Sequence, residues 1–185
     1  MKITIHNPRE FKTKLSAAID FTSKDDSRIA LQSVRFTRHI MGSHLVMEAI
    51  DGFRMIQETL NVRFDSDDDV EFSLSASDLK MVAKTLVSVI EVDDKTVTFT
   101  TVEKAQMTFK ITESHSVSFE SVKPKSDPLF SILVDPKKLM SACKAFKDED
   151  GIRLYFRNEL DPILIYRGSN PEKATGCAMV LPMRP

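Results

Sequence analysis

Three stretches of the chain repeat one order of hydrophobic and polar positions. In the first stretch, Ile3 and Ile5 alternate with polar neighbours, which predicts a half-buried strand over 2–6. Asn7-Pro8 then supplies a helix cap followed by proline at the first helical position. Beyond it, apolar residues recur at spacings of three and four, as expected for a helix with one buried stripe: Phe11, Leu15, Ala18, Ile19 and Thr22.

The same order occurs twice more. In the second copy a strand with alternating apolar residues (Val70, Phe72, Leu74) precedes a cap at Ser75 or Ser77, and the expected helix carries Leu79, Val82, Ala83, Leu86 and Ile90. In the third copy the strand residues are Phe130, Ile132 and Val134, the cap is Asp135-Pro136, and the helix carries Leu139, Met140, Cys143 and Phe146. The starts of the helices, near residues 8, 77 and 136, give a repeat of about 60 to 70 residues.

After each helix the pattern returns to period two. We expect strands over 29–37, 45–49, 55–62, 96–101, 106–111, 117–119, 152–156, 163–166 and 178–181, with turn signals such as Asp51-Gly52 between them. Each copy therefore reads as a βαβββ unit. The predicted fold class is α+β, built from repeated βαβββ units whose helices cover one face of antiparallel sheets.

The two stretches that connect the three copies differ in composition. The stretch 123–128, Lys-Pro-Lys-Ser-Asp-Pro, has the composition of a domain linker, whereas the acidic stretch 65–71 reads as a solvated connection between the first two copies. We therefore expect a domain over 1–125, made of units over about 1–64 and 65–122, followed by half a domain over 126–185. Units of this size rarely stand alone, so neighbouring units are expected to share sheets.

Composition restricts the class of protein. The 185 residues are 42% hydrophobic and 29% charged with a net charge of -1, which allows a substantial core and excludes a tail that wraps nucleic acid by bulk charge. The five glycines form neither GxGxxG nor a P-loop, and two cysteines are too few for a disulfide framework. Because the sequence shows no signal peptide and no long apolar run, we expect a cytoplasmic protein with no membrane partner.

Enzyme and metal chemistry have little support in the sequence. The four histidines have no metal-binding spacing, the cysteines form no CxxC pair, and no GxSxG occurs. We therefore expect no catalytic residue, no metal and no cofactor. An enzyme that uses the region of Asp51 is only the third hypothesis.

The polar faces of the three expected helices are basic. Residues 136–147 contain four lysines and no acidic residue. A charged helix face is often merely solvated, but three such helices on one side of a continuous sheet would line a positive surface suited to the phosphates of a polyanion. The candidate DNA-binding residues are Arg9, Lys12, Lys14, Lys80, Lys84, Lys137, Lys138, Lys144 and Lys147.

Three short motifs resemble one family. Residues 48–55, Glu-Ala-Ile-Asp-Gly-Phe-Arg-Met, resemble the Ala-Thr-Asp-Gly-His-Arg-Leu segment of the bacterial DNA polymerase III β sliding clamps. Residues 180–185, Val-Leu-Pro-Met-Arg-Pro, resemble the Val-Met-Pro-Met-Arg-Leu end of that family, and 26–31, Asp-Ser-Arg-Ile-Ala-Leu, is similar to the entry into a strand of its middle domain. The resemblance extends over most of the chain, including the strand–helix–strand order over 129–167.

The resemblance implies a non-catalytic replication processivity factor. Family members form a ring of βαβββ units, with helices lining a bore around duplex DNA and sheets outside, and tether polymerases to DNA. This chain has three units where members have six, as if the middle domain were joined to the last half-domain. It also departs from the family at Phe53, Leu181 and Pro185, where members have His, Met and Leu.

The resemblance further implies an apolar cleft for the short peptides of polymerases and other clients. The first unit would contribute Leu31, Ile50, Gly52, Phe53, Arg54 and Met55, and the third Leu160, Pro162, Met179, Leu181, Pro182, Met183 and Arg184. Methionines adapt to varied apolar anchors, and the two arginines would orient peptide carbonyls or a carboxylate. From periodicity alone, Met55, Met179 and Leu181 are equally well explained as core residues.

Two functions remain open from the sequence. The first is a compact sliding clamp of a bacterial cell or phage-infected host, which binds double-stranded DNA without sequence preference, tethers a polymerase, and closes as a homo-oligomer, either a tetrameric ring or a dimer. The second is a decoy that binds clamp-client peptides without encircling DNA.

Overall fold

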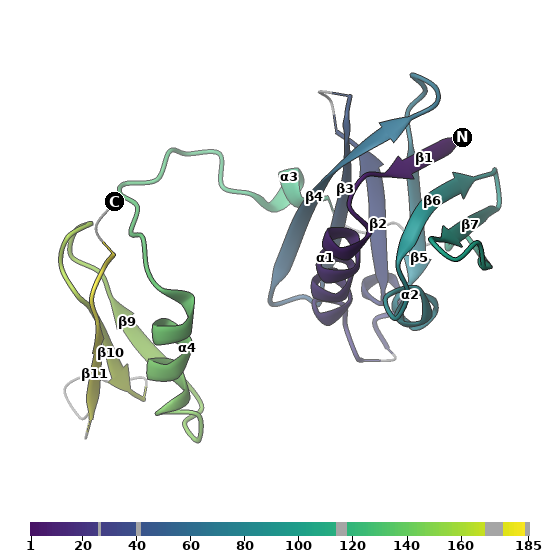
Figure 1. Cartoon of the computed structure of the whole chain (residues 1–185). Coiled ribbons are helices and arrows are strands. Elements are labelled where there is room, and N and C mark those ends of the chain that lie inside the picture. The colour runs from purple at the N-terminus through teal and green to yellow at the C-terminus, as the bar shows by residue number, and fades with distance from the viewer. Residues whose placement is uncertain (26, 40–41, 114–117, 169–175, 184–185) are drawn as a thin grey trace. The chain divides into compact units, whose positions relative to one another are not determined.

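The computed structural model describes residues 1–25, 27–39, 42–113, 118–168 and 176–183. The chain forms two compact units, Met1–Lys123 and Pro124–Pro185, which we call unit 1 and unit 2 (Figure 1). From here on, the three expected βαβββ stretches are called repeats: unit 1 contains the first two repeats and unit 2 the third. The boundary between them lies in the proline-containing segment 123–128.

The first repeat of unit 1 follows the expected order. Asn7 caps the first helix by accepting a hydrogen bond from the backbone N–H of Glu10, and Pro8 occupies the first turn. Phe11, Leu15, Ala18 and Ile19 form its buried stripe, as their spacing predicts. The elements are β1 (Lys2–Ile5), α1 (Pro8–Asp20), a 3-10 turn η1 (Ile29–Leu31), β2 (Ser33–Arg38), β3 (His44–Ile50) and β4 (Met55–Phe64).

The second repeat contains a shorter helix than expected. Ser75, rather than Ser77, accepts the capping hydrogen bond from the N–H of Asp78. The helix ends at Val82, so the expectation of a helix that reaches Ile90 is wrong. The residues after Leu86 are mostly β-branched, and they form a strand instead. The elements are β5 (Glu71–Ser75), α2 (Ala76–Val82), β6 (Val87–Val92), β7 (Thr96–Thr101) and β8 (Gln106–Lys110).

The two repeats of unit 1 share one eight-stranded antiparallel sheet in the order β5-β2-β3-β4-β1-β6-β7-β8. The first strand of each repeat pairs with the strand that follows the helix of the other repeat, so β1 pairs with β6 and β5 with β2. Across the second of these joints, the rings of Phe36 and Phe72 stack with their centroids 4.7 Å apart. Helices α1 and α2 pack against each other, and α1 also contacts β3 and β4 (Figure 1). The α+β class with antiparallel sheets is thus confirmed.

Of two further strand expectations in unit 1, one is wrong at its start and the other is wrong. The expected strand over 29–37 begins only at Ser33, because 29–31 forms the 3-10 turn, in which Ile29 is exposed. The expected strand over 117–119 is replaced by the short helix α3 (Phe119–Val122), whose cap is Ser118, while Val117 lies outside the described residues. Both segments leave the sheet because their backbone groups are bonded locally instead of to a neighbouring strand.

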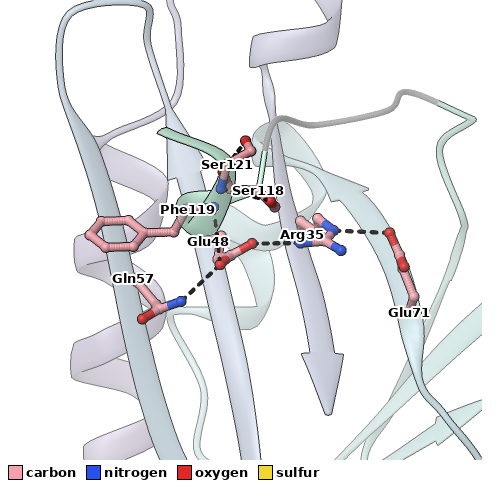
Figure 2. Close-up of polar contacts among 7 residues, drawn as sticks. All are labelled: Arg35, Glu48, Gln57, Glu71, Ser118, Phe119 and Ser121. Atoms are coloured by element: carbon pink, nitrogen blue, oxygen red, sulfur yellow. Dashed lines mark hydrogen bonds and ion pairs between the residues drawn. The ribbon is translucent and has the colours of Figure 1, made fainter. Parts of the chain in front are cut away.

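A buried carboxylate holds α3 against the sheet. The Glu48 side chain on β3 receives an ion pair from Arg35 at 2.7 Å and a hydrogen bond from Gln57 Nε2 at 2.9 Å. The backbone N–H of Phe119 donates a third bond to Glu48 Oε1, and Arg35 Nε pairs with Glu71 at 2.9 Å (Figure 2). The charge of Glu48, which is only 4% exposed, is therefore compensated on several sides.

The described part of unit 2 contains one helix and a three-stranded sheet. The elements are α4 (Pro136–Lys144), β9 (Ile152–Tyr155), β10 (Ile163–Arg167) and β11 (Cys177–Val180), and the sheet order is β11-β10-β9. Asp135 caps α4 as expected, by accepting hydrogen bonds from the N–H groups of Lys137 and Lys138. A small core forms around Phe146, Ile163, Ile165 and Val180.

The expected strand with Phe130, Ile132 and Val134 is not a strand in the structure. Ile132 and Val134 pack on the core of unit 2, and the carbonyl of Leu133 accepts a hydrogen bond from the N–H of Met183 at 2.8 Å. In unit 1 the corresponding strands pair with a second repeat, which unit 2 lacks. The segment 130–134 therefore has the alternating side chains of a strand but lacks the ladder of backbone hydrogen bonds that defines one.

Among the helices of the described residues, none has the length and apolar character needed to span a bilayer.

Candidate functional site

The loop between β3 and β4 is organised by Asp51. Its Oδ1 accepts hydrogen bonds from the backbone N–H groups of Phe53, at 2.9 Å, and Arg54, at 2.8 Å. Its Oδ2 accepts a third bond from Arg54 Nε at 2.8 Å. The bond from Phe53, followed by the two from Arg54, lowers the pKa of Asp51 from 3.8 to about 2. The loop is therefore a fixed turn around a charged carboxylate at neutral pH.

Gly52 suits the tip of this loop for two reasons. Its φ of +96° lies in the left-handed region, which residues with a side chain rarely adopt. A β-carbon at this position would also lie 2.6 Å from Nη1 of Arg28 and 3.7 Å from Cδ1 of Leu31. The glycine thus lets the loop approach the segment that contains Arg28 and Leu31.

Phe53 projects from the loop and is 89% exposed. The Arg28 guanidinium lies over its ring, 5.7 Å from the centroid, and the Arg54 guanidinium lies over the ring of Phe21 at 4.4 Å. Arg54 is also held by the carbonyl of Asp20 at 2.9 Å. Arg54 is therefore engaged in fixing the loop, and Arg28 is the cation that lies beside the exposed ring.

A pocket of about 330 Å³ opens beside Phe53. It combines an exposed aromatic ring, two arginines and a lysine with two carboxylates, groups that can contact an apolar side chain, donate hydrogen bonds to carbonyls and pair with a carboxylate. Its lining residues are Thr22, Ser23, Lys24, Asp25, Arg28, Asp51, Phe53 and Arg54.

The unit 1 residues of the expected cleft occupy one end of this unit. Gly52, Phe53 and Arg54 form the loop, and Leu31 lies next to Gly52. Ile50 and Met55 face each other across the last pair of the β3–β4 ladder at the base of the loop, and both are half-buried. Arg28 was not among the expected residues, although it stands in the motif over 26–31. Its position beside Phe53 depends on a contact between distant segments that periodicity does not reveal.

Unit 2 has a separate groove of about 740 Å³. One wall is a face of α4 with its cap, and the other is β11 with the segment that follows it. The exposed side chains of Met179, Leu181 and Met183 make the second wall apolar, and the hydrogen bond between Met183 and Leu133 fixes its end. The lining consists of Asp135, Lys138, Ser141, Ala142, Ala145, Met179, Val180, Leu181, Pro182 and Met183.

The other unit 2 residues of the expected cleft lie elsewhere. Leu160 is exposed in a turn in which Asn158 Oδ1 accepts hydrogen bonds from the N–H groups of Leu160 and Asp161, and Pro162 is half-buried immediately before β10. Neither lines the groove. Arg184 lies outside the described residues.

The basic residues of α1 and α2 divide into two groups. Lys12 Nζ donates to the carbonyl of Lys84 at 3.2 Å, which connects α1 with the end of α2, and Arg9, Lys80 and Lys84 are exposed. Lys14 instead turns toward β4, where it donates to the carbonyl of Thr59 at 2.6 Å and pairs with Glu10 at 2.7 Å. Lys14 is thus less available to an external anion than the others.

The four lysines of the third expected helix also differ in position. Lys138 lines the groove with Asp135, whereas Lys137 and Lys144 are exposed on α4 outside the lining. Because α4 ends at Lys144, Lys147 lies one turn beyond it. Lys137 and Lys144 are seven residues apart, which places them on the same side of the helix.

Comparisons with known proteins identify the fold. No family model matches the chain, and no curated protein matches its sequence. Among solved structures, the DNA polymerase sliding clamp of Bacillus subtilis matches 98% of this chain with a TM-score of 0.81 and 18% identity, over 49% of its own length.

Two further clamps give similar values. The DNA polymerase III β subunit of Pseudomonas aeruginosa has a TM-score of 0.79 at 18% identity, with 98% of this chain and 51% of that chain covered. The Helicobacter pylori β clamp bound to a DNA ligase peptide has a TM-score of 0.76 at 12% identity, with 98% and 49% covered. The likeness to bacterial β clamps that the motifs imply is confirmed at the level of the fold, and the chain spans about half the length of these clamps.

Proposed function

We propose that this protein is a sliding-clamp-like factor of DNA replication, which holds duplex DNA without reading its sequence and tethers a DNA polymerase through a short peptide. The observation that carries the proposal is the agreement of 98% of the chain with a bacterial sliding clamp at a TM-score of 0.81. No catalytic step is assigned to it. It would act in the cytoplasm of a bacterial cell or a phage-infected host.

The DNA-binding part of the proposal is supported by the charge of the helices. Arg9, Lys12, Lys80 and Lys84 belong to α1, α2 and the turn after α2, and Lys137 and Lys144 to α4, while the whole chain has a net charge of -1. A basic helix surface on a slightly acidic protein favours contact with phosphates at a defined place.

The peptide-binding part is supported by two surfaces, the pocket beside Phe53 and the groove of unit 2. The pocket beside Phe53 offers an exposed ring with an arginine over it, and the groove of unit 2 offers two methionines and a leucine. Both surfaces suit a short segment with apolar anchors and a negatively charged group. The H. pylori clamp of similar fold is bound to a DNA ligase peptide.

Retention on circular DNA tests the clamp function. The protein is incubated with a nicked circular plasmid, separated from free protein at moderate salt, and the plasmid is then cut once. A clamp stays on the circle and is lost from the cut DNA over its ends, whereas a protein held only by charge is retained equally by both. Equal retention contradicts encirclement.

A peptide titration tests the client site. A fluorescent DNA ligase peptide is titrated by polarisation against the wild type, Phe53→Ala and Met183→Ala, with Val102→Ala as the matched control because Val102 is exposed outside both surfaces. We expect at least roughly tenfold weaker binding for the first two variants, as is common for anchoring residues, and no change for the control. Equal affinity of all four proteins contradicts the assignment.

The second candidate function is a decoy that binds clamp-client peptides without encircling DNA. It is favoured by the pocket beside Phe53 and the groove of unit 2, which suit a peptide independently of the basic helices. Peptide binding that depends on Phe53, together with equal retention on circular and cut DNA, would select this function.

A further inference from the structure

Unit 1 shows how two repeats complete each other. The first strand of each repeat lies between its own repeat and the other one: β1 pairs with β4 on one side and with β6 on the other. In the same way, β5 covers the outer edge of β2. Each repeat therefore donates one strand and receives one strand, and both post-helix strands, β2 and β6, are covered.

Unit 2 contains both parts of this arrangement without a partner for either. Within the described part of unit 2, β9, the post-helix strand, pairs only with β10, so its outer edge is open. The segment 130–134 contacts the residues after β11 through the hydrogen bond between Met183 and Leu133. This contact corresponds to the pairing of β1 with β4 in unit 1. On its other side, within the described residues, the segment pairs with no strand. Open strand edges of this kind favour association.

We propose that two copies of this chain associate through unit 2, each placing its segment 130–134 along β9 of the other. The composite sheet would then contain eight strands from two copies. Their order would be partner 130–134, β9, β10, β11, 130–134, partner β9, partner β10 and partner β11. This is the order of unit 1, in which β5-β2-β3-β4-β1-β6-β7-β8 are arranged in the same way. The contact is two-fold and isologous.

The β5–β2 ladder of unit 1 guides the register. There the residue before the helix cap, Leu74, pairs with Val34, a core-facing residue of the post-helix strand, and Phe72 pairs with the core-facing Phe36. In unit 2 the cap is Asp135, and the apolar positions before it have the same spacing as those of β5. Aligning the core faces of the two strands gives three cross-strand pairs between copies: Val134 with Ile152, Ile132 with Leu154, and Phe130 with Phe156.

Every one of these pairs joins two apolar side chains. Phe130, Leu154 and Phe156 are 37%, 39% and 48% exposed in the single chain, so the association would remove water from them. A shift of the register by one residue would pair core-facing with outward-facing residues. A second copy satisfies both open edges with one contact repeated twice, which is why we assign this surface to a second copy.

This joint deepens the proposed function, because a ring made of these chains needs contacts between copies. The experiment measures association alone. Its failure would remove the joint and leave DNA retention and peptide binding to be judged by their own tests.

Light scattering after gel filtration of the full chain tests the proposal. We expect the wild type to have at least twice the chain mass of 20.9 kDa, and Phe156→Glu and Phe130→Lys each to halve the observed mass. The double variant Phe130→Lys with Phe156→Glu sets the new carboxylate of one copy against the new ammonium group of the other, and it is expected to recover the mass. Val102→Glu, at an exposed apolar residue of unit 1, is the matched control and should keep the wild-type mass.

Two results would overturn the proposal. One is a wild type that keeps the chain mass at high micromolar concentration, and the other is a folded double variant that does so. If a single variant has a lower melting temperature than the wild type, its mass does not test the joint, and the mass of the double variant is used instead.

Disulfide trapping tests the association and its register independently of the charged variants. In a chain with Cys143→Ser and Cys177→Ser, oxidation of the pair Ile132→Cys and Leu154→Cys should give a covalent dimer, because opposed residues have Cβ atoms about 5 Å apart. Within one chain β10 and β11 separate the two positions, so a bond inside the chain is not expected. The pair Ser131→Cys and Leu154→Cys, which faces opposite sides of the sheet, should not cross-link, and equal cross-linking of both pairs contradicts the register.

Discussion

The backbone N–H of Phe119 donates a 3.3 Å hydrogen bond to Oε1 of Glu48, which lies on β3, far away in the sequence (Figure 2). The same carboxylate is paired with Arg35 and bonded by Gln57. Because α3 directly precedes the segment between the two units, Glu48 fixes the point at which the chain leaves unit 1. A buried charge on a central strand thus orders the end of a domain.

Removal of this carboxylate should destabilise unit 1. Glu48→Ala leaves the guanidinium of Arg35 with Glu71 alone, and we expect a loss of about 2 to 3 kcal/mol in the free energy of unfolding, near the lower limit for broken buried pairs because Arg35 is partly exposed. Urea denaturation followed by circular dichroism measures it. The control is Glu91→Ala, which breaks the exposed pair with Lys2 and should cost less than about 1 kcal/mol. Equal losses would show that the network of Glu48 has no special role.

Substitution of Gly52 should weaken peptide binding beyond the effect of backbone strain. In Gly52→Ala, alanine must adopt a φ of +96°, and its β-carbon would lie 2.6 Å from Nη1 of Arg28, so the loop or Arg28 must move. Gly42→Ala is the matched control, because its φ is +85° and its nearest neighbour is 3.8 Å away. Both variants should lose about 1 kcal/mol of stability or more, and only Gly52→Ala should lose affinity for the DNA ligase peptide. Equal affinity of both variants would contradict a role of this loop in binding.

Local signals in the sequence predicted the parts of the fold that local physics determines. The cap at Asn7 and the stripe of α1 need only neighbouring residues, and both are found. The helix expected to reach Ile90 failed because an apolar stripe with helical spacing also occurs in Val87–Val92, where β-branched residues and pairing with β1 favour a strand. Competition between a short helix and a strand is decided by the sheet, which the sequence pattern does not display.

The candidate site shows the same division. The turn at Asp51 and Gly52 was predictable, because both its hydrogen bonds and its left-handed φ are local properties. The place of Arg28 over Phe53 was not, because the two residues belong to separate loops that only the folded sheet brings together. The groove of unit 2 similarly combines α4 with the chain after β11, and it excludes Leu160, which the family resemblance had grouped with them.

The carboxylate of Asp51 should keep the loop ordered well into the acid range. Its pKa in the folded protein is about 2, below its ordinary value of 3.8, so its contribution is fully present above about pH 4 and is lost as the pH falls toward 2. A carboxyl titration by NMR, with the amide of Phe53 as second reporter, measures this. In Arg54→Met the pKa should rise and still remain below 3.8, because the backbone N–H groups continue to donate. A midpoint at the ordinary value in the wild type would contradict the hydrogen bonds.

Charge reversal on unit 2 should weaken duplex binding by reducing the number of phosphates that the protein touches. Changing Lys137, Lys138, Lys144 and Lys147 to Glu is expected to lower affinity for any duplex sequence and to reduce the slope of log affinity against log salt by roughly 0.9 for each phosphate that is no longer neutralised. Filter binding or polarisation with two unrelated duplexes over a range of salt concentrations measures both quantities. Lys138 lines the groove, so its single reversal should have a smaller effect than that of Lys137 or Lys144.

The matched control reverses four exposed lysines outside the basic helices, Lys95, Lys104, Lys110 and Lys125, which changes the net charge equally. If duplex DNA is held by a defined surface, the control keeps most of the wild-type slope, because the slope counts the phosphates that the protein neutralises and not its total charge. If both sets reduce the slope to the same extent, binding depends on net charge alone and α4 is not a DNA-contacting helix. A fall in affinity with an unchanged slope would likewise show that these four lysines neutralise no phosphate, because the slope counts the phosphates that the protein neutralises.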